Sequence, residues 1–187
     1  MTLSTIGILL FDGVEELDVV GPWEVFTASS ALLERAGAVR CRKGMRVLTD
    51  FSFTDHPPLD VLVVPGGDGV LLGVQDPALL RWLAEVGARA RWVVSVCTGA
   101  LLLHASGLGK GRRLATHWAF EDRLAELGAE VVRDARWVRD GNVVSSQGVS
   151  AGIDVALWLV GQLHSPAHAR ATQRYIQYDP APPYADG

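Results

Sequence analysis

The stretch VVSVCTGALLL, Val93 to Leu103, changes from strand-forming to helix-forming residues at a single cysteine, Cys97. The residues before the cysteine are mostly valines, and β-branched side chains favour a strand. Small residues follow it, and a run of leucines then continues with a composition typical of a helix. A strand that turns directly into a helix is the basic unit of an α/β protein. This stretch therefore predicts a β-α unit with a cysteine at its corner.

The same alternation of strand-like and helix-like segments runs along the rest of the chain. Residues 59–67, LDVLVVPGG, are typical of a strand buried on both faces of a parallel sheet, because Leu and Val are almost continuous there. The pair Asp140-Gly141 predicts a turn between two short strands. We expect further strands at 5–11, 38–42, 45–49, 91–96 and 113–116, and helices at 15–29, 77–90, 98–106, 117–128, 150–164 and from 165 to a Pro-rich tail. This order predicts an α/β fold with a mainly parallel, doubly wound sheet and, without a linker, one domain over 1–187.

Composition and charge exclude several classes of protein. The chain has 187 residues, of which 49% are hydrophobic and 20% charged, with a formal net charge of −4, as expected of a globular protein. Its densest basic group, GKGRR at 109–113, is short and has no aromatic residue. We therefore expect no nucleic-acid partner.

The start of the chain and its two cysteines bear on location. The segment MTLSTIGILLF has no basic leader and is soon followed by Asp12 and Glu15, so we expect neither a signal peptide nor a membrane span. This predicts a cytoplasmic protein that does not bind membranes. Cys41 and Cys97 do not form a disulfide framework, and a reducing compartment favours free thiols.

The predicted position of Cys97 favours nucleophilic chemistry. Ligands of parallel α/β sheets bind outside the carboxyl ends of the strands, where Cys97 is expected. A sharp strand-turn-helix corner, the nucleophile elbow, is compatible with the small residues Thr98 and Gly99 that follow. The helix N-terminus favours the thiolate over the thiol. The alternative is an inert buried cysteine, since most free cysteines pack as small hydrophobes and Ser95 replaces the usual glycine of the elbow.

A glycine pair is expected at the same edge of the sheet. The sequence PGGDG, residues 65–69, directly follows the most apolar predicted strand. Gly66 and Gly67 permit positive φ angles and expose backbone N–H groups, which together with the amide of Thr98 predict an oxyanion hole. An ordinary tight turn is the alternative.

Acidic residues follow the first predicted strand. Asp18 is embedded among apolar residues, where burial raises the pKa of a carboxyl and suits it to share a proton with a neighbouring thiolate. For Glu15 and Glu16 we favour the simpler role of complementing a helix N-terminus.

Histidines offer an accessory residue and no metal site. His117 opens a predicted helix at the same sheet edge, so it is either a base or substrate orienter or a structural residue. His164 and His168 have the spacing of zinc ligands, but Ser165 and Pro166 are typical of a helix start, which places His164 outside the helix. We therefore expect no metal and no other cofactor.

The motifs along the chain together resemble the DJ-1/PfpI superfamily, and within it the isonitrile hydratase-like branch. They are GVEELDVVGPWEVF (13–26), DVLVVPGGDG (60–69), VVSVCTGALLLHASGLGKGRRLATHW (93–118), VSAGIDVALWLV (149–160) and QYDPAPPY (177–184). The resemblance covers nearly the whole chain. It implies a flavodoxin-like three-layer sandwich, a cysteine nucleophile elbow and a homodimer.

The resemblance also implies roles for particular residues. Cys97 takes the place of the nucleophile and Asp18 that of the acid beside it, where relatives carry Glu or Asp. The amides of Gly67 and Thr98, beside Gly66, take the place of the oxyanion hole, and the Thr98 hydroxyl is placed to contact substrate. His117 matches a histidine that completes a triad in protease-like branches and has a doubtful catalytic role in the hydratase branch.

The function implied by this branch is hydration of a small isonitrile to an N-substituted formamide. Asp rather than Glu at position 18 and the tail YDPAPPY favour this reading. The alternatives are a peptidase, amidase or glyoxalase-like enzyme that uses the same cysteine, and a redox or ligand sensor related to the N-terminal domains of AraC-type regulators. We do not expect a DNA-binding regulator, because no basic helical module follows before Gly187.

Overall fold

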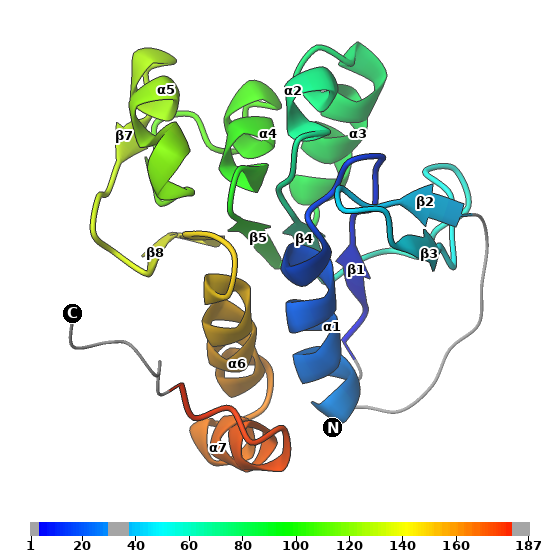
Figure 1. Cartoon of the computed structure of the whole chain (residues 1–187), viewed down its shortest axis with the longest axis vertical. Helices are drawn as coiled ribbons and strands as arrows, with labels where there is room; N and C mark the ends of the chain where they lie inside the picture. The colour runs from blue at the N-terminus through cyan, green and yellow to red at the C-terminus, as the bar shows by residue number, and fades with distance from the viewer. Residues whose placement is uncertain (1–3, 30–37, 181–187) are drawn as a thin grey trace.

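A computed structural model describes residues 4–29 and 38–180. Strands and helices alternate along them as the sequence predicts (Figure 1). The strands are β1 Ile6–Ile8, β2 Ala38–Arg40, β3 Arg46–Leu48, β4 Val61–Val64, β5 Trp92–Val96, β6 Arg113–Leu114, β7 Glu130–Val131, β8 Trp137–Asp140 and β9 Val143–Ser146. The helices are α1 Glu16–Ser29, α2 Val70–Gly73, α3 Pro77–Gly87, α4 Gly99–Ala105, the 3₁₀ turn η1 Trp118–Phe120, α5 Glu121–Glu126, α6 Ala151–Leu163 and α7 Pro166–Tyr175.

Five strands form the central sheet in the order β1-β4-β5-β9-β8. The first four are parallel, with Val61 opposite Trp92 and Val93 opposite Val143, whereas β8 runs antiparallel to β9. All residues of β4 and β5 are buried, as the apolar runs predict for central parallel strands. The mainly parallel sheet is therefore confirmed.

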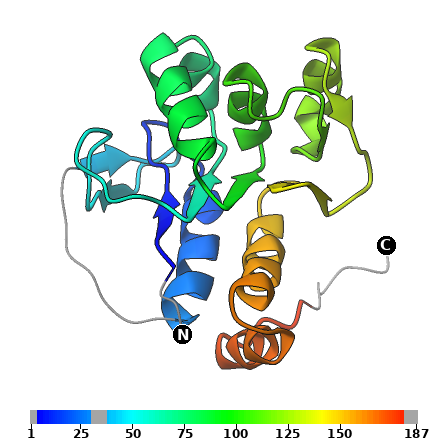
Figure 2. The same cartoon turned by 180° about the vertical axis from the view of Figure 1, so that it is seen from behind.

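Helices cover both faces of this sheet. Figures 1 and 2 show α1 and α6 side by side on one face, and α2, α3 and α4 on the other. Alternate residues of β4 supply the two cores: Val61 and Val63 pack with the apolar side of α6, and Leu62 and Val64 pack with the leucines of α3 and α4. The three layers confirm the flavodoxin-like sandwich.

Some elements differ from those the sequence predicts. β1 has three residues instead of the seven at 5–11, and the segment 117–128 forms η1 and α5 instead of one helix. The short helix α2 was not expected. The Asp-Gly turn between β8 and β9 is confirmed, with Gly141 at φ 62°.

The C-terminal part begins as predicted. Ser165 caps α7, because its side chain accepts a hydrogen bond from the amide of His168 at 3.1 Å. Residues 181–187 of the Pro-rich tail lie outside the described residues. Within 4–29 and 38–180, every helix is too short or too polar to cross a lipid bilayer.

Candidate active site

Cys97 lies at the sharp turn between β5 and α4. Its φ angle is 57°, in the left-handed region that residues other than glycine rarely adopt, and it is 5% exposed. Two contacts hold this backbone: the Cys97 amide donates to the Ser146 carbonyl at 3.2 Å, and its carbonyl accepts from Thr116 Oγ1 at 2.9 Å. The strained corner is thus fixed by the neighbouring strand β9 and by the segment that follows β6.

Asp18 lies in the first turn of α1, directly beside this corner. Its side chain is fully buried, and Oδ2 accepts a hydrogen bond from the Gly66 amide at 2.9 Å. The carboxyl also interacts with the Cys97 thiol as a hydrogen-bonding neighbour, which affects the pKa of both groups. The fold therefore brings together two residues that are 79 positions apart in the sequence.

Burial decides where protons reside in this pair. Desolvation raises the pKa of Asp18 to about 7, against the opposing hydrogen bond from Gly66 and with a further contribution from the charge of Glu15. Desolvation, followed by the charge of Asp18, raises the pKa of Cys97 to about 12, although the Thr98 amide lowers it. The effect of the helix N-terminus, from which we expected a thiolate, is thus outweighed. At neutral pH the pair retains at least one proton.

The glycine loop lies against the same cysteine corner. Gly66 is so close to Thr98 that a Cβ on Gly66 would lie 2.6 Å from both the amide nitrogen and Oγ1 of Thr98. The Gly66 amide is directed at Asp18, and the Gly67 amide donates to Thr98 Oγ1 at 3.0 Å. Of these three amides, that of Thr98 interacts with the Cys97 sulfur. In this arrangement Gly66 holds the acid and Gly67 holds Thr98, while the Thr98 amide is available for developing charge.

His117 comes just before η1 and lies close to the cysteine. Its Nδ1 accepts a hydrogen bond from the Ala119 amide at 3.2 Å, and its ring is tilted against that of Trp118 at 5.5 Å. A neutral imidazole that accepts at Nδ1 carries its hydrogen on Nε2. His117 is therefore arranged as a hydrogen-bond donor rather than as a base for the thiol.

Gly148 is a site residue that the sequence reasoning missed. A Cβ on Gly148 would lie 2.7 Å from Cys97 Sγ and also 2.7 Å from His117 Cδ2. Cys97 Sγ and His117 Cδ2 therefore lie within twice that distance of each other, and a side chain on Gly148 would clash with both. Gly148 follows β9 at the carboxyl edge of the sheet. Ligands of parallel sheets bind outside the carboxyl ends of the strands. The same rule that predicted Cys97 and the glycine loop at the site would have predicted Gly148 if it had also been applied to the end of β9.

Glu15 has ion-pair partners that the sequence did not predict. α1 begins at Glu16, so Glu15 precedes the helix, and its side chain is only 4% exposed. It forms ion pairs with Arg42, at 3.0 Å from Nη1, and with Lys43. Burial opposes its ionisation, but hydrogen bonds from the two cations leave the pKa of Glu15 lowered. Arg42 and Lys43 are remote from Glu15 in the sequence, so the residues around Glu15 could not predict these ion pairs.

The remaining histidines lie elsewhere in the fold. His104 is packed on α4, where Nε2 contacts the Leu127 carbonyl at 3.0 Å. His164 ends α6 and its ring is tilted against that of His168, with centroids 5.0 Å apart. Across residues 4–29 and 38–180, no group of three or more His, Cys, Asp or Glu is placed to bind a metal ion.

Comparison with known proteins places this geometry in a family. The model of the DJ-1/PfpI family matches residues 4–162. The chain is 41% identical over 187 residues to an isonitrile hydratase of Pseudomonas putida, covering 97% of this chain and 82% of that protein. It is 31% identical over 148 residues to the HTH-type transcriptional regulator CdhR of Pseudomonas aeruginosa, which covers 77% of this chain and 41% of the regulator.

Solved structures agree with this assignment. The crystal structure of a THiJ/PfpI family protein from Pseudomonas syringae superimposes with a TM-score of 0.92 at 36% identity, covering 100% of this chain and 80% of that one. The sequence motifs, the sheet order and the cysteine corner all support the same family assignment. The chain belongs to the DJ-1/PfpI family.

Proposed function

We propose that this protein is a cysteine-dependent hydratase that converts a small isonitrile to an N-substituted formamide. The observation that carries the proposal is the buried pair of Cys97 and Asp18. The Asp18 carboxyl can take the proton of the Cys97 thiol and can then donate it to the substrate. The 41% identity to an isonitrile hydratase supports this choice of substrate.

The first step is addition of the thiol to the terminal carbon of R–N≡C. The Asp18 carboxylate takes the proton from Cys97 as sulfur attacks the carbon. Asp18 then donates that proton to the same carbon, and the product is a thioimidate, Cys–S–CH=N–R. An S–C bond and a C–H bond form while the S–H bond breaks. The Thr98 amide is suited to stabilise negative charge that develops beside the sulfur.

The second step is hydrolysis by one water molecule. Asp18, ionised again, takes a proton from the water molecule as the water oxygen attacks the thioimidate carbon. Asp18 then donates that proton to the thioimidate nitrogen. The C–S bond then breaks, the hydroxyl proton returns to the sulfur through Asp18, and R–NH–CHO is released. The same carboxyl thus serves as acid and base in both steps, for which a pKa near neutrality is suited.

The geometry favours this scheme over a protease-like triad. A triad requires His117 to accept the proton of Cys97, whereas its Nδ1 accepts from Ala119 and its Nε2 carries the hydrogen. Amidase, peptidase and glyoxalase-like activities that use Asp18 as the acid–base group are alternatives with the same cysteine.

A second candidate function is ligand sensing without turnover. The observation in its favour is the 31% identity to a transcriptional regulator. A sensor would bind a small molecule at Cys97 and release it unchanged.

We also propose a cytoplasmic homodimer in which residues 1–187 act as one domain. An apolar stripe on α1 supports the dimer, since Leu17, Val20 and Trp23 are spaced at helical intervals and are 39%, 39% and 53% exposed. Light scattering of the intact chain at micromolar concentration tests this, and a monomer would contradict it.

The function is tested by measuring formamide release from cyclohexyl isocyanide. Wild type should turn over, and Cys97→Ala should lose turnover because no other group forms the thioimidate. Cys41→Ala is the matched control, since Cys41 is also buried, at 2% exposure, but lies between β2 and β3. If wild type binds the isocyanide without releasing formamide, the protein is a sensor; if it neither binds nor hydrates it, isonitrile hydration is excluded.

A further inference from the structure

The turn between β2 and β3, residues 41–45, contacts the loop that leads to Asp18. The Arg42 amide donates to the Val14 carbonyl at 2.7 Å. The Lys43 amide donates to Glu16 Oε1 at 2.6 Å, and the Lys43 ammonium pairs with Glu15. The turn is therefore bound to the residues immediately before the acid.

The loop before Asp18 is in turn joined to the glycine loop. The Glu15 amide donates to the Gly66 carbonyl at 2.9 Å, and the Gly66 amide donates to Asp18 at 2.9 Å. Val14 and Gly67 form an isolated antiparallel bridge. A shift of either loop would thus move the carboxyl relative to Cys97.

One side chain spans both loops. Arg42 Nη1 lies 3.0 Å from Glu15 Oε2, and Arg42 Nε lies 2.7 Å from Asp68 Oδ2. The guanidinium is planar with its donors in a fixed fork, so these two contacts fix the separation of the two carboxylates. Arg42 itself is outside the reacting groups.

We propose that Arg42 is a positioning residue for the reaction, which holds the Asp18 loop and the glycine loop in register by bridging Glu15 and Asp68. The proposal rests on the function inferred for Cys97 and Asp18. Misplacement by about 1 Å of a reacting group costs about 100-fold in rate, so a loosened bridge should lower kcat while leaving KM nearly unchanged.

The bridge has an electrostatic consequence at Asp18. Two charged groups act on this carboxyl, Glu15 and Lys43, and the Gly66 amide and the Cys97 thiol act on it through hydrogen bonds. Glu15 raises the pKa of Asp18, and Arg42 and Lys43 compensate the charge of Glu15. Removing the guanidinium should therefore raise the pKa of Asp18, and removing the charge of Glu15 should lower it.

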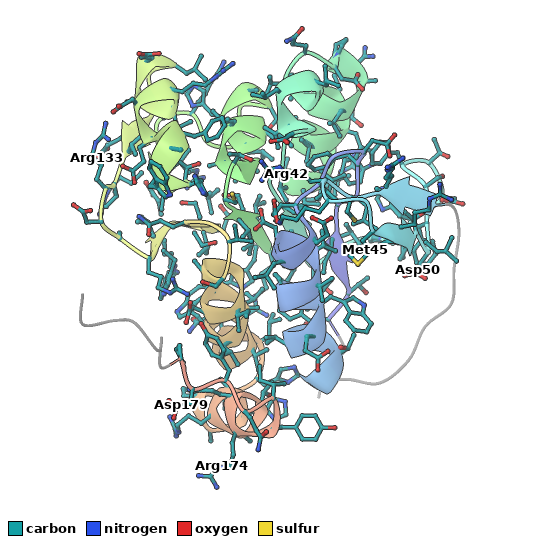
Figure 3. All side chains as sticks on the ribbon, in the orientation of Figure 1. Arg42, Met45, Asp50, Arg133, Arg174 and Asp179 are labelled. Carbon is teal, nitrogen blue, oxygen red and sulfur yellow. The ribbon has the colours of Figure 1, made fainter. Side chains whose placement is uncertain are left out.

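The test uses Arg42→Met, Glu15→Gln and a matched control, Arg133→Met. Arg133 also bridges two carboxylates, Glu121 at 3.2 Å and Asp122 at 2.6 Å, and its side chain is 49% exposed against 46% for Arg42. Figure 3 labels both arginines: Arg42 lies near the middle of the molecule above α1, and Arg133 lies at the outer edge beside α5.

Two readouts are measured on each variant, with thermal unfolding to check that it folds. The first is kcat and KM for cyclohexyl isocyanide. The second is the rate at which iodoacetamide alkylates Cys97 as a function of pH, whose lower midpoint reports the first ionisation of the coupled pair. We expect Arg42→Met to lower kcat by about 10- to 100-fold, and to move the alkylation midpoint to higher pH. Glu15→Gln should move it to lower pH, and Arg133→Met should leave both readouts at wild-type values.

The outcomes separate this proposal from the proposed function. If wild type has no hydratase activity, the proposed function fails, and opposite shifts of the alkylation midpoint would still support the bridge. Midpoints that stay at the wild-type value, or that move in the same direction in Arg42→Met and Glu15→Gln, would overturn the positioning role. A kcat of Arg42→Met equal to that of Arg133→Met would overturn it as well.

Discussion

Replacing Asp18 by Asn should remove the loss of stability that wild type undergoes as pH rises towards neutrality, and it should abolish the acid–base step. Burial raises the pKa of Asp18 from 3.8 to about 7. Between these values the folded protein keeps a proton that the unfolded chain has lost, so the free energy of unfolding of wild type falls by about 1.4 kcal/mol per pH unit from this group. The favourable contribution is complete below pH 3.8 and is lost as pH rises through 7. Over the whole interval the free energy of unfolding of wild type falls by about 4 kcal/mol because of this group. Asn does not ionise, so the variant should not show this fall.

The assay is urea unfolding of wild type and Asp18→Asn from pH 4 to pH 8. The difference in unfolding free energy between the two should change by about 4 kcal/mol in favour of the variant as pH rises. Asp50→Asn is the control, because it makes the same substitution at an exposed position. A difference between wild type and Asp18→Asn that is constant with pH would refute the assignment of a proton to buried Asp18 at neutral pH.

Three further results are expected. The kcat/KM of wild type should rise with pH through about 7, because the fully protonated pair has no nucleophile, and this limb should be absent from Asp18→Asn. Gly148→Ala should lower kcat by about 100-fold, since its Cβ would lie 2.7 Å from Cys97 Sγ; wild-type turnover would contradict the close packing at the sulfur. Leu102→Ala changes a fully buried position on α4 and should lower the free energy of unfolding by about 2–5 kcal/mol, measured by urea unfolding. A smaller decrease would show that the core relaxes around the missing side chain.

Much of the fold was predictable because its signals are local. The apolar runs of β4 and β5 indicate central parallel strands, and the Ser165-Pro166 pair marks the start of α7. The segment 117–128 was less predictable, since His117 and Phe120 participate in a 3₁₀ turn before α5 begins. The short strand β1 also differs, because strand length depends on the partner with which it pairs.

By itself, the sequence determined the order of strands and helices, and therefore which residues follow the carboxyl ends of strands. This is why Cys97, Gly66 and His117 could be expected at one edge of the sheet. The same order predicts Asp18 at the start of the helix after the first strand, and its apolar neighbours correctly indicate a raised pKa.

Only the tertiary structure decided the protonation of Cys97 and the contacts that support the site. The raised pKa of Cys97 arises from burial and from the charge of Asp18, both of which exist only after the chain has folded. Likewise, Arg42 forms ion pairs with Glu15 and Asp68, which are 27 and 26 positions away in the sequence. Desolvation and ion pairing depend on distances in space, and composition or periodicity along the chain does not encode those distances.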